Sequence, residues 1–138
     1  MDKNILVSEI MSTDLITLNL NDQLEDAKKI FKENTIRHIP IVKNKEIIGM
    51  LSYADILKVS FPDLSNDEKS IETYVYDMFT IEQVMTKNLY LVSADSTVKD
   101  IVELLTTKEF HALPVVQDGE LVGIVTTKDL MSFLLTLL

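Results

Sequence analysis

The chain contains one sequence twice, and this repeat constrains its fold more than any other feature. Residues 11–58 align with residues 85–132 at a constant offset of 74, without insertion or deletion. Identical residues recur at aligned positions that include Met11/Met85, Asp26/Asp100, Pro40/Pro114, Val42/Val116, Glu46/Glu120, Gly49/Gly123 and Asp55/Asp129. Two copies are too few for a solenoid, which needs at least about three stacked units. The repeat therefore predicts a closed, pseudo-symmetric pair.

The length of 138 residues fits a single module, 1–138. Within it we place repeat one at 8–58, an acidic connector at 59–81 and repeat two at 82–138. A unit of about 50 residues buries too little surface to be stable alone. We therefore expect the two halves to share one core.

Each repeat predicts the same order of elements: strand, helix, strand, strand, helix. In repeat one, a strand at 16–18 precedes a helix with apolar residues at helical spacing from Leu24 to Phe31. Two apolar runs around the polar turn 43–46 form a hairpin pattern, and a second helix begins near Ser52. The same pattern recurs in repeat two, so the predicted fold class is α+β with two β-α-β-β-α repeats.

Local rules predict the helix starts and the position of the prolines. Asp22 with Glu25 three residues later is typical of an N-cap and N3 pair, and in repeat two Asp95 or Ser96 can cap. Proline cannot donate to a strand ladder. We therefore expect Pro40, and its copy in repeat two, among the first residues of a strand or on an edge strand.

The connector is acidic and periodic. Its apolar residues recur at helical spacing, at Ile71, Tyr74, Val75, Met78 and Phe79. Only Lys69 offsets the acids in and beside this stretch, which are Asp63, Asp67, Glu68, Glu72, Asp77 and Glu82. Their spacing matches no calcium-binding loop. We expect a partly helical, solvated segment and no metal site.

Composition argues against several classes of function. The net charge of −9 repels nucleic acid, whose binding depends on Lys and Arg. The chain has no cysteine and two histidines, and it contains no catalytic set of nucleophile, base and orienting group. The N-terminal residues do not resemble a signal peptide, and no apolar run approaches the roughly 20 residues of a membrane span. We expect a cytoplasmic protein that is not an enzyme, with no nucleic-acid or membrane partner.

Four features, each present in both repeats, resemble the CBS domain, named for cystathionine β-synthase. They are the starts Ile10-Met11-Ser12 and Val84-Met85-Thr86, the apolar-Pro-apolar-Val strand, the Gly-apolar-apolar-Ser/Thr-x-x-Asp segments 49–55 and 123–129, and their common order. The resemblance covers nearly the whole chain. It implies a tandem pair, or Bateman module, whose two sheets pack face to face about a pseudo-two-fold axis.

The resemblance also implies a function. Clefts between the repeats of such pairs commonly bind adenosine-containing ligands such as AMP, ADP, ATP or S-adenosylmethionine. Two modules often form a disc-shaped homodimer. The family regulates, for example by energy sensing, and does not itself catalyse, so no cofactor is required. An effector protein, which the sequence does not name, would read the change.

The Ser52-x-x-Asp55 and Thr126-x-x-Asp129 segments have two compatible interpretations. A hydroxyl followed three residues later by an acid is close to a capping box, worth about 1 kcal/mol. The resemblance adds that the Asp accepts hydrogen bonds from ribose hydroxyls and that the Ser/Thr contacts ribose or phosphate. A carboxylate only accepts hydrogen bonds, which suits a vicinal diol.

The basic residues before the proline strands are either solvated or phosphate-binding. Arg37 and His38 hold these places in repeat one, and His111 does so in repeat two, with Lys108 or Lys128 as additional cations. We favour the phosphate hypothesis, because Arg can bind a phosphate bidentately. The different residues predict two sites of unequal affinity.

Two further predictions concern the base. In the family the first strand of each repeat contacts the base, which points to Thr17 and Leu91 here. Tyr53 departs from the small or polar residues common at its position, and it would either stack on a base or fill and block the cleft. The favoured function is a stand-alone sensor of an adenosyl ligand. The alternative is a structural dimerisation module without a ligand, in which the apolar C-terminal helix packs on the other repeat or on a second copy.

Overall fold

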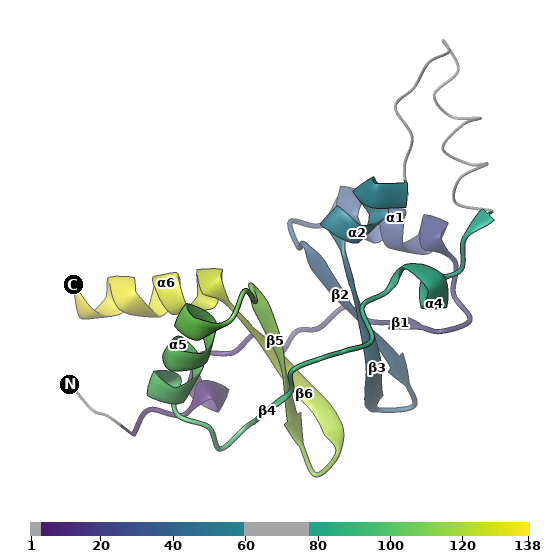
Figure 1. Cartoon of the computed structure of the whole chain (residues 1–138). Helices are drawn as coiled ribbons and strands as arrows, with labels where there is room; N and C mark the ends of the chain where they lie inside the picture. Colours follow the sequence, from purple (N-terminus) through teal and green to yellow (C-terminus); the bar gives the residue numbers. More distant parts are fainter. Residues whose placement is uncertain (1–3, 60–77) are drawn as a thin grey trace. The chain divides into compact units, whose positions relative to one another are not determined.

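The computed structural model describes residues 4–59 and 78–138 (Figure 1). The chain divides into two compact units. The central unit is Ile16–Asn88, and the terminal unit combines Met1–Leu15 with Leu89–Leu138. The predicted helix of the connector falls mostly outside the described residues, as do all of its acids except Glu82.

The central unit is a three-stranded sheet with helices. Its strands are β1 (Leu18–Asn19), β2 (His38–Lys43) and β3 (Glu46–Ser52), and its helices are α1 (Leu24–Glu33), α2 (Tyr53–Val59) and α4 (Ile81–Val84). The strand order is β1-β2-β3. Strand β1 pairs parallel to β2, and β2 pairs antiparallel to β3. The parallel pair follows from the crossover through α1, because parallel neighbours need a long connection.

The terminal unit repeats this arrangement. Its strands are β4 (Val92–Ser93), β5 (Ala112–Gln117) and β6 (Glu120–Thr126), and its helices are η1 (Val7–Glu9), α5 (Val98–Thr107) and α6 (Thr127–Leu137). The order is β4-β5-β6, with β4 parallel and β6 antiparallel to β5. Both hairpins have an irregular register at the same place, after Ile41 and after Val115. The predicted α+β class and the two β-α-β-β-α repeats are confirmed.

The segment that begins each repeat packs on the sheet of the other repeat. Ser12 exchanges two backbone hydrogen bonds with Ile124, of 2.8 and 3.0 Å, and Thr86 exchanges two with Met50, of 2.8 and 3.0 Å. A Cβ on Gly123 would overlap the side chain of Met11, and a Cβ on Gly49 would overlap that of Met85. Glycine is needed at both positions because a methionine lies directly on the backbone. The sequence repeats and the compact units are therefore different divisions of the chain.

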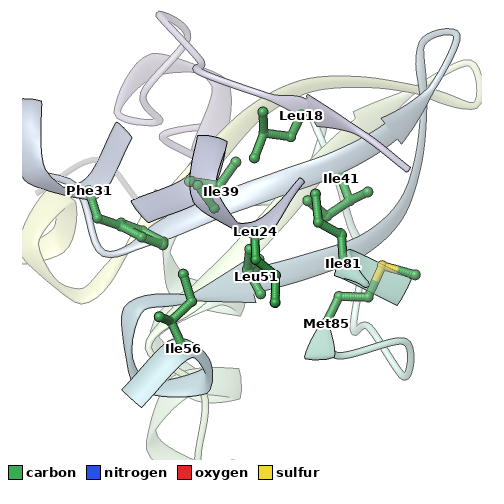
Figure 2. Packing of buried hydrophobic residues seen from close by; sticks show 10 residues of the cluster. Leu18, Leu24, Phe31, Ile39, Ile41, Leu51, Ile56, Ile81 and Met85 are labelled. Carbon is green, nitrogen blue, oxygen red and sulfur yellow. The ribbon is translucent and has the colours of Figure 1, made fainter. Parts of the chain in front are cut away.

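The buried residues form two clusters, one in each unit. The central cluster includes Ile81, the last residue of the connector, and Met85 of repeat two (Figure 2), and the terminal cluster includes Val7 from the N-terminal segment. Each cluster thus contains residues from both halves of the chain, and the expectation that the two halves share one core stays a prediction. Each sheet is covered by its own two helices and by the segment that leads into the other repeat, which we call the exchanged segment. Together these supply the apolar surface that one repeat lacks.

Pro40 is the third residue of β2, so it lies among the first residues of a strand, as one of the two expectations has it. Strand β2 is the central strand of its sheet and not an edge strand. The pairing explains why it fits. Pro40 stands opposite Met50, whose N–H and C=O point away from β2 to Thr86. Antiparallel pairs alternate between hydrogen-bonded and non-hydrogen-bonded positions. Pro40 occupies a non-hydrogen-bonded position and needs no donor there, and Pro114 opposite Ile124 is equivalent.

The first helix of each repeat starts later than predicted. Helix α1 has Gln23 as its N-cap, and the Asp26 carboxylate accepts a hydrogen bond from the Gln23 N–H at 2.9 Å. Helix α5 has Thr97 as its N-cap, with Asp100 three residues later. The predicted caps Asp22, Asp95 and Ser96 are wrong. Asp22 instead accepts from the Asn19 N–H at 2.8 Å, which closes the turn before the helix.

Candidate functional site

The predicted site residues of repeat one gather at one end of the central sheet. Strands β1 and β2 begin at this end, and the antiparallel β3 ends there. His38 pairs with Ser52, and Thr17 directly precedes the β1 residue that pairs with Ile41. Thr17 is thus level with Pro40, about 7 Å along the strand from His38. The structure brings five predicted residues to this end, namely Thr17, Arg37, His38, Ser52 and Asp55.

The terminal unit gathers the residues predicted from repeat two in the same way. Ala112 pairs with Thr126, so His111 lies beside the start of α6. Leu91 precedes β4, and both Lys128 and Asp129 lie in the first turn of α6. The five residues at this end of the terminal sheet are Leu91, His111, Thr126, Lys128 and Asp129. The ten predicted residues thus form two groups of five, one in each unit.

Both Ser/Thr-x-x-Asp segments are reciprocal capping boxes. Asp55 Oδ2 accepts from the Ser52 N–H at 3.0 Å, and Ser52 Oγ accepts from the Asp55 N–H at 3.0 Å. Asp129 Oδ2 accepts from the Thr126 N–H at 2.9 Å, and Thr126 Oγ1 accepts from the Asp129 N–H at 3.1 Å. The capping interpretation is confirmed. Each cap uses one carboxylate oxygen, so the second oxygen of each Asp is available for another donor.

The second carboxylate oxygen has different hydrogen-bond partners in the two units. Asp129 Oδ1 accepts from the Ser12 hydroxyl at 3.1 Å. Thr86 is the aligned partner of Ser12, and the backbone bonds to Met50 hold it in the equivalent place. Among the residues that the structure describes, no hydrogen bond joins the Thr86 hydroxyl to Asp55. The two carboxylates therefore have different numbers of free acceptor positions.

A backbone hydrogen bond ties the loop before each central strand to the start of the following helix. The Tyr53 N–H donates to the Arg37 carbonyl at 2.9 Å, and the Thr127 N–H donates to the His111 carbonyl at 3.1 Å. In the central unit the Arg37 guanidinium also lies over the Tyr53 ring, with its Cζ 5.2 Å from the centroid. Arg37 and His111 are both exposed, while His38 is half-buried.

A model of the CBS domain matches the chain twice, at residues 7–61 and 81–136. The chain belongs to the CBS-domain family. A CBS domain-containing protein of Dictyostelium discoideum is 30% identical over 97% of this chain and 94% of its own length. The CBS segments of the chain therefore form a tandem pair, as the resemblance implied.

Solved CBS-pair structures have the same fold. A putative acetoin utilization protein from Vibrio cholerae is 28% identical, with a TM-score of 0.80 over 96% of this chain and 92% of that chain. The CBS pair of protein MJ0100, solved in complex with 5′-methylthioadenosine and S-adenosyl-L-methionine, is 29% identical. Its TM-score is 0.76 over 96% of this chain and 98% of that chain.

Other curated relatives are much longer than this CBS pair. The chain spans 48% of the length of uncharacterized protein MJ1225 of Methanocaldococcus jannaschii, at 23% identity. It spans 22% of the length of an L-aspartate semialdehyde sulfurtransferase of the same organism, at 31% identity. The match to that enzyme is thus confined to about a fifth of its chain.

The terminal unit of this CBS pair also has an apolar hollow of about 1120 Å³. Residues of α5 and α6 line most of it, including Val102, Leu105, Leu130, Met131, Leu134 and Leu137. At the end of α6, Leu135 is 74% exposed and Leu138 89% exposed. The C-terminal helix therefore presents apolar surface that the described residues of the terminal unit leave uncovered.

Residues 4–59 and 78–138 contain neither a metal-binding cluster nor a helix that could span a membrane. No group of three or more His, Cys, Asp or Glu side chains comes close enough to hold a metal ion there. Over the same residues, no helix combines the length and apolarity that crossing a bilayer requires.

Sequence reasoning missed Ser12 as a residue of the site. It noted Ser12 only as part of the Ile10-Met11-Ser12 segment, whose copy is Val84-Met85-Thr86. The alignment indicates that the two residues are equivalent, but it carries no signal that Ser12 lies against Asp129. That contact depends on the exchange of segments between repeats, which only the structure reveals.

Proposed function

We propose that this CBS pair is a regulatory sensor that binds an adenosine-containing ligand and signals through a change of conformation. The observation that carries the proposal is the duplicated carboxylate, Asp55 and Asp129. Each is fixed by a capping box, with an oxygen beyond the cap bond, at the sheet end that also holds Arg37 or His111. The 29% identical MJ0100 pair, which binds two adenosyl ligands, supports this class of ligand.

The chemistry of each group suits one part of such a ligand. A carboxylate that only accepts hydrogen bonds matches the two donors of a ribose diol. Arg37, His38, His111 and Lys128 would contact phosphate or another anionic group, which bidentate arginine binds well. Thr17 and Leu91 precede the first strands and would contact the base, and Ser52 and Thr126 would face ribose or phosphate. The predicted position of the ligand is the cleft between the repeats.

A ligand panel tests the proposal directly. Thermal unfolding and calorimetric titration would be measured with AMP, ADP, ATP and S-adenosylmethionine. A ligand at 100 times its Kd stabilises the folded protein by about 2.7 kcal/mol, because it binds only that state. We expect stabilisation by at least one of the four. Absence of any shift and any heat at millimolar ligand would contradict the proposal.

Variants of the two carboxylates separate ligand binding from capping. We expect Asp55→Ala and Asp129→Ala each to weaken binding at one site by about tenfold or more, since each removes a charged acceptor. Asp100→Ala is the matched control, because Asp100 occupies the same N3 position of a capping box in α5. It should cost a similar stability of about 1 kcal/mol and leave ligand affinity unchanged. Equal affinity losses in all three variants would indicate a purely structural role.

Signalling requires two arrangements with different affinity for the ligand. We propose that an effector protein reads this difference and that the module acts without catalysis or a cofactor. We also place it in the cytoplasm, with no nucleic-acid or membrane partner, in keeping with its net charge of −9. Turnover of a nucleotide that is lost in Asp55→Ala and Asp129→Ala would contradict the non-catalytic part.

A second candidate function is a dimerisation module that needs no ligand. The uncovered apolar surface of α6 and the hollow beside it favour this candidate. A homodimer of modules is compatible with both candidates, so the dependence on ligand separates them. Sedimentation with and without AMP or S-adenosylmethionine would be the test. Self-association that no ligand alters favours the second candidate, and Leu135→Lys should weaken it, because Leu135 is 74% exposed and not part of the core.

A further inference from the structure

Three side chains of the central unit form a stack beside the predicted site residues. The rings of Phe31 and Tyr53 meet edge to face, with centroids 5.7 Å apart and planes at 75°. The guanidinium of Arg37 lies over the Tyr53 ring, 5.2 Å from its centroid. Phe31 belongs to the buried cluster in Figure 2. The stack therefore connects an exposed cation to the core of the unit.

The contact with the Tyr53 ring leaves most of the N–H donors of Arg37 free. The Tyr53 N–H fixes the Arg37 carbonyl at 2.9 Å, and Arg37 Nη1 donates to the Ile36 carbonyl at 3.3 Å. A guanidinium has five N–H donors, and among the described residues only the Ile36 carbonyl accepts from one of them. No acidic side chain within the described part of the chain pairs with Arg37. An exposed, oriented arginine is thus available to an anion, although the chain has 22 acidic residues.

Repeat two replaces all three members of the stack. At the offset of 74, Phe31 aligns with Leu105, Arg37 with His111 and Tyr53 with Thr127. Leu105 and Thr127 have no ring on which a cation can lie, and Thr127 Oγ1 instead donates to the His111 carbonyl at 3.5 Å. The backbone bond between the helix start and the loop is retained. The difference between the repeats is therefore specific to the stack.

We propose that Tyr53 is a positioning residue that orients Arg37 and so gives the central unit a preference for adenosine ligands that carry phosphate. Holding a long side chain in place before binding lowers the entropy that binding must overcome. The planar fork of arginine then meets phosphate oxygens bidentately. This inference rests on the proposed function. It adds the chemical class of the ligand and assigns Tyr53 a role opposite to that of a blocking residue.

The test compares AMP with 5′-methylthioadenosine, which has the same base and ribose but no phosphate. Calorimetry would be performed on the full chain as wild type, Tyr53→Phe, Tyr53→Thr, Arg37→Ala and Leu57→Thr. Tyr53→Thr copies the residue of repeat two, and Tyr53→Phe keeps the ring. Leu57→Thr is the control, because Leu57 is an exposed apolar residue one turn further along α2.

We expect Tyr53→Thr to weaken AMP binding roughly two- to fivefold, the range of an exposed cation–π contact, and to leave 5′-methylthioadenosine unaffected. Tyr53→Phe and Leu57→Thr should bind both ligands as the wild type does. Arg37→Ala should lose at least about tenfold for AMP, because it removes charged hydrogen bonds. The AMP effects should shrink at high salt, where exposed charges are screened.

Several outcomes would overturn the inference while leaving the proposed function intact. They are equal losses for both ligands in Tyr53→Thr, a Tyr53→Phe variant as weak as Tyr53→Thr, and tighter AMP binding in Tyr53→Thr. The last would identify Tyr53 as a blocking residue. A wild type that binds neither of these ligands, nor ADP, ATP or S-adenosylmethionine, would overturn both proposals.

A measurement on the ligand-free protein tests the positioning step by itself. Relaxation of the Arg37 15Nε nucleus reports the order of its side chain on the picosecond to nanosecond timescale. We expect this order to fall in Tyr53→Thr and to stay unchanged in Tyr53→Phe. Equal order in the wild type and Tyr53→Thr would contradict the positioning role.

Discussion

The central and terminal units share a backbone but differ in the side chains at the end of the sheet. In the central unit an arginine lies on a tyrosine that rests on a buried phenylalanine. In the terminal unit Leu105 and Thr127 replace the two rings of the stack, and an aromatic pair lies elsewhere, with Tyr90 and Phe110 centroids 5.8 Å apart. These two residues align with Ile16 and Ile36. Duplication has thus kept the capping boxes and the Met–Gly contacts, while the surface chemistry has diverged.

The largest expected effect on stability concerns the exchanged segments. Val7 and Ile81 are aligned, both are 0% exposed, and each packs in the unit of the other repeat. Val7→Asp should destabilise the terminal unit, and Ile81→Asp the central unit, by about 3–4 kcal/mol, because each buries an unpaired carboxylate. Hydrogen exchange measures this, since amides of β5 and β6 should lose protection first in Val7→Asp. Loss of protection first in β2 and β3 of that variant would contradict the exchange.

The two Met–Gly contacts should respond unequally to an added methyl group. At Gly49 the three atoms nearest to an added Cβ all belong to the Met85 side chain, whereas at Gly123 they include the Ser12 carbonyl oxygen at 3.0 Å beside two atoms of Met11. Gly123→Ala should cost about 2–3 kcal/mol and Gly49→Ala about 1–2 kcal/mol, because a side chain yields more readily than backbone. Chemical denaturation measures both.

A second substitution shows whether the methionine is the obstacle. Met85→Ala should relieve part of the Gly49→Ala cost, while Met11→Ala should relieve less of the Gly123→Ala cost. Equal rescue in both pairs would mean that the Ser12 carbonyl does not matter.

The smallest effect distinguishes the two carboxylates. Ser12→Ala removes a hydrogen bond to Asp129 and should cost about 0.5–1.5 kcal/mol. Thr86→Ala is the matched control and should stay within about 0.5 kcal/mol, the range of a neutral surface change. Thermal unfolding of both variants measures the difference. A Thr86→Ala loss as large as that of Ser12→Ala would show that the two carboxylates are held alike.

The sequence predicted the fold through its repeat and through the capping segments, because both depend on local spacing. The predicted starts of the first helices were wrong by one or two residues. Asp22 and Glu25 have the residue types of an N-cap and N3 pair, but they lie one residue too early in the chain. The aligned pair Asp26/Asp100 carried the correct signal, because only a shared structural duty preserves an acid in both copies. The structure brings the predicted site residues to one end of each sheet. Their contacts with a ligand stay a prediction.

The partner of each leading segment could not be predicted from the sequence. Met11 and Met85 are interchangeable by type and by spacing, so no local rule tells which glycine each one covers. That choice depends on packing between segments far apart in the chain. Ser12 was missed for the same reason. The role of Tyr53 was left open between stacking on a base and blocking the cleft, because the sequence does not show which side chains its ring contacts.

The exchange of Met11 and Met85 also changes what a cut between the repeats would release. A break among residues 60–77 would not produce one fragment for each unit. The N-terminal fragment would carry all three strands of the central sheet together with Val7 and Met11 of the terminal unit, and the C-terminal fragment would carry Ile81 and Met85 of the central unit. Each fragment would hold a piece that only the other can complete. We therefore expect the two fragments to reassemble after the covalent link is lost, because each supplies part of the core that the other lacks.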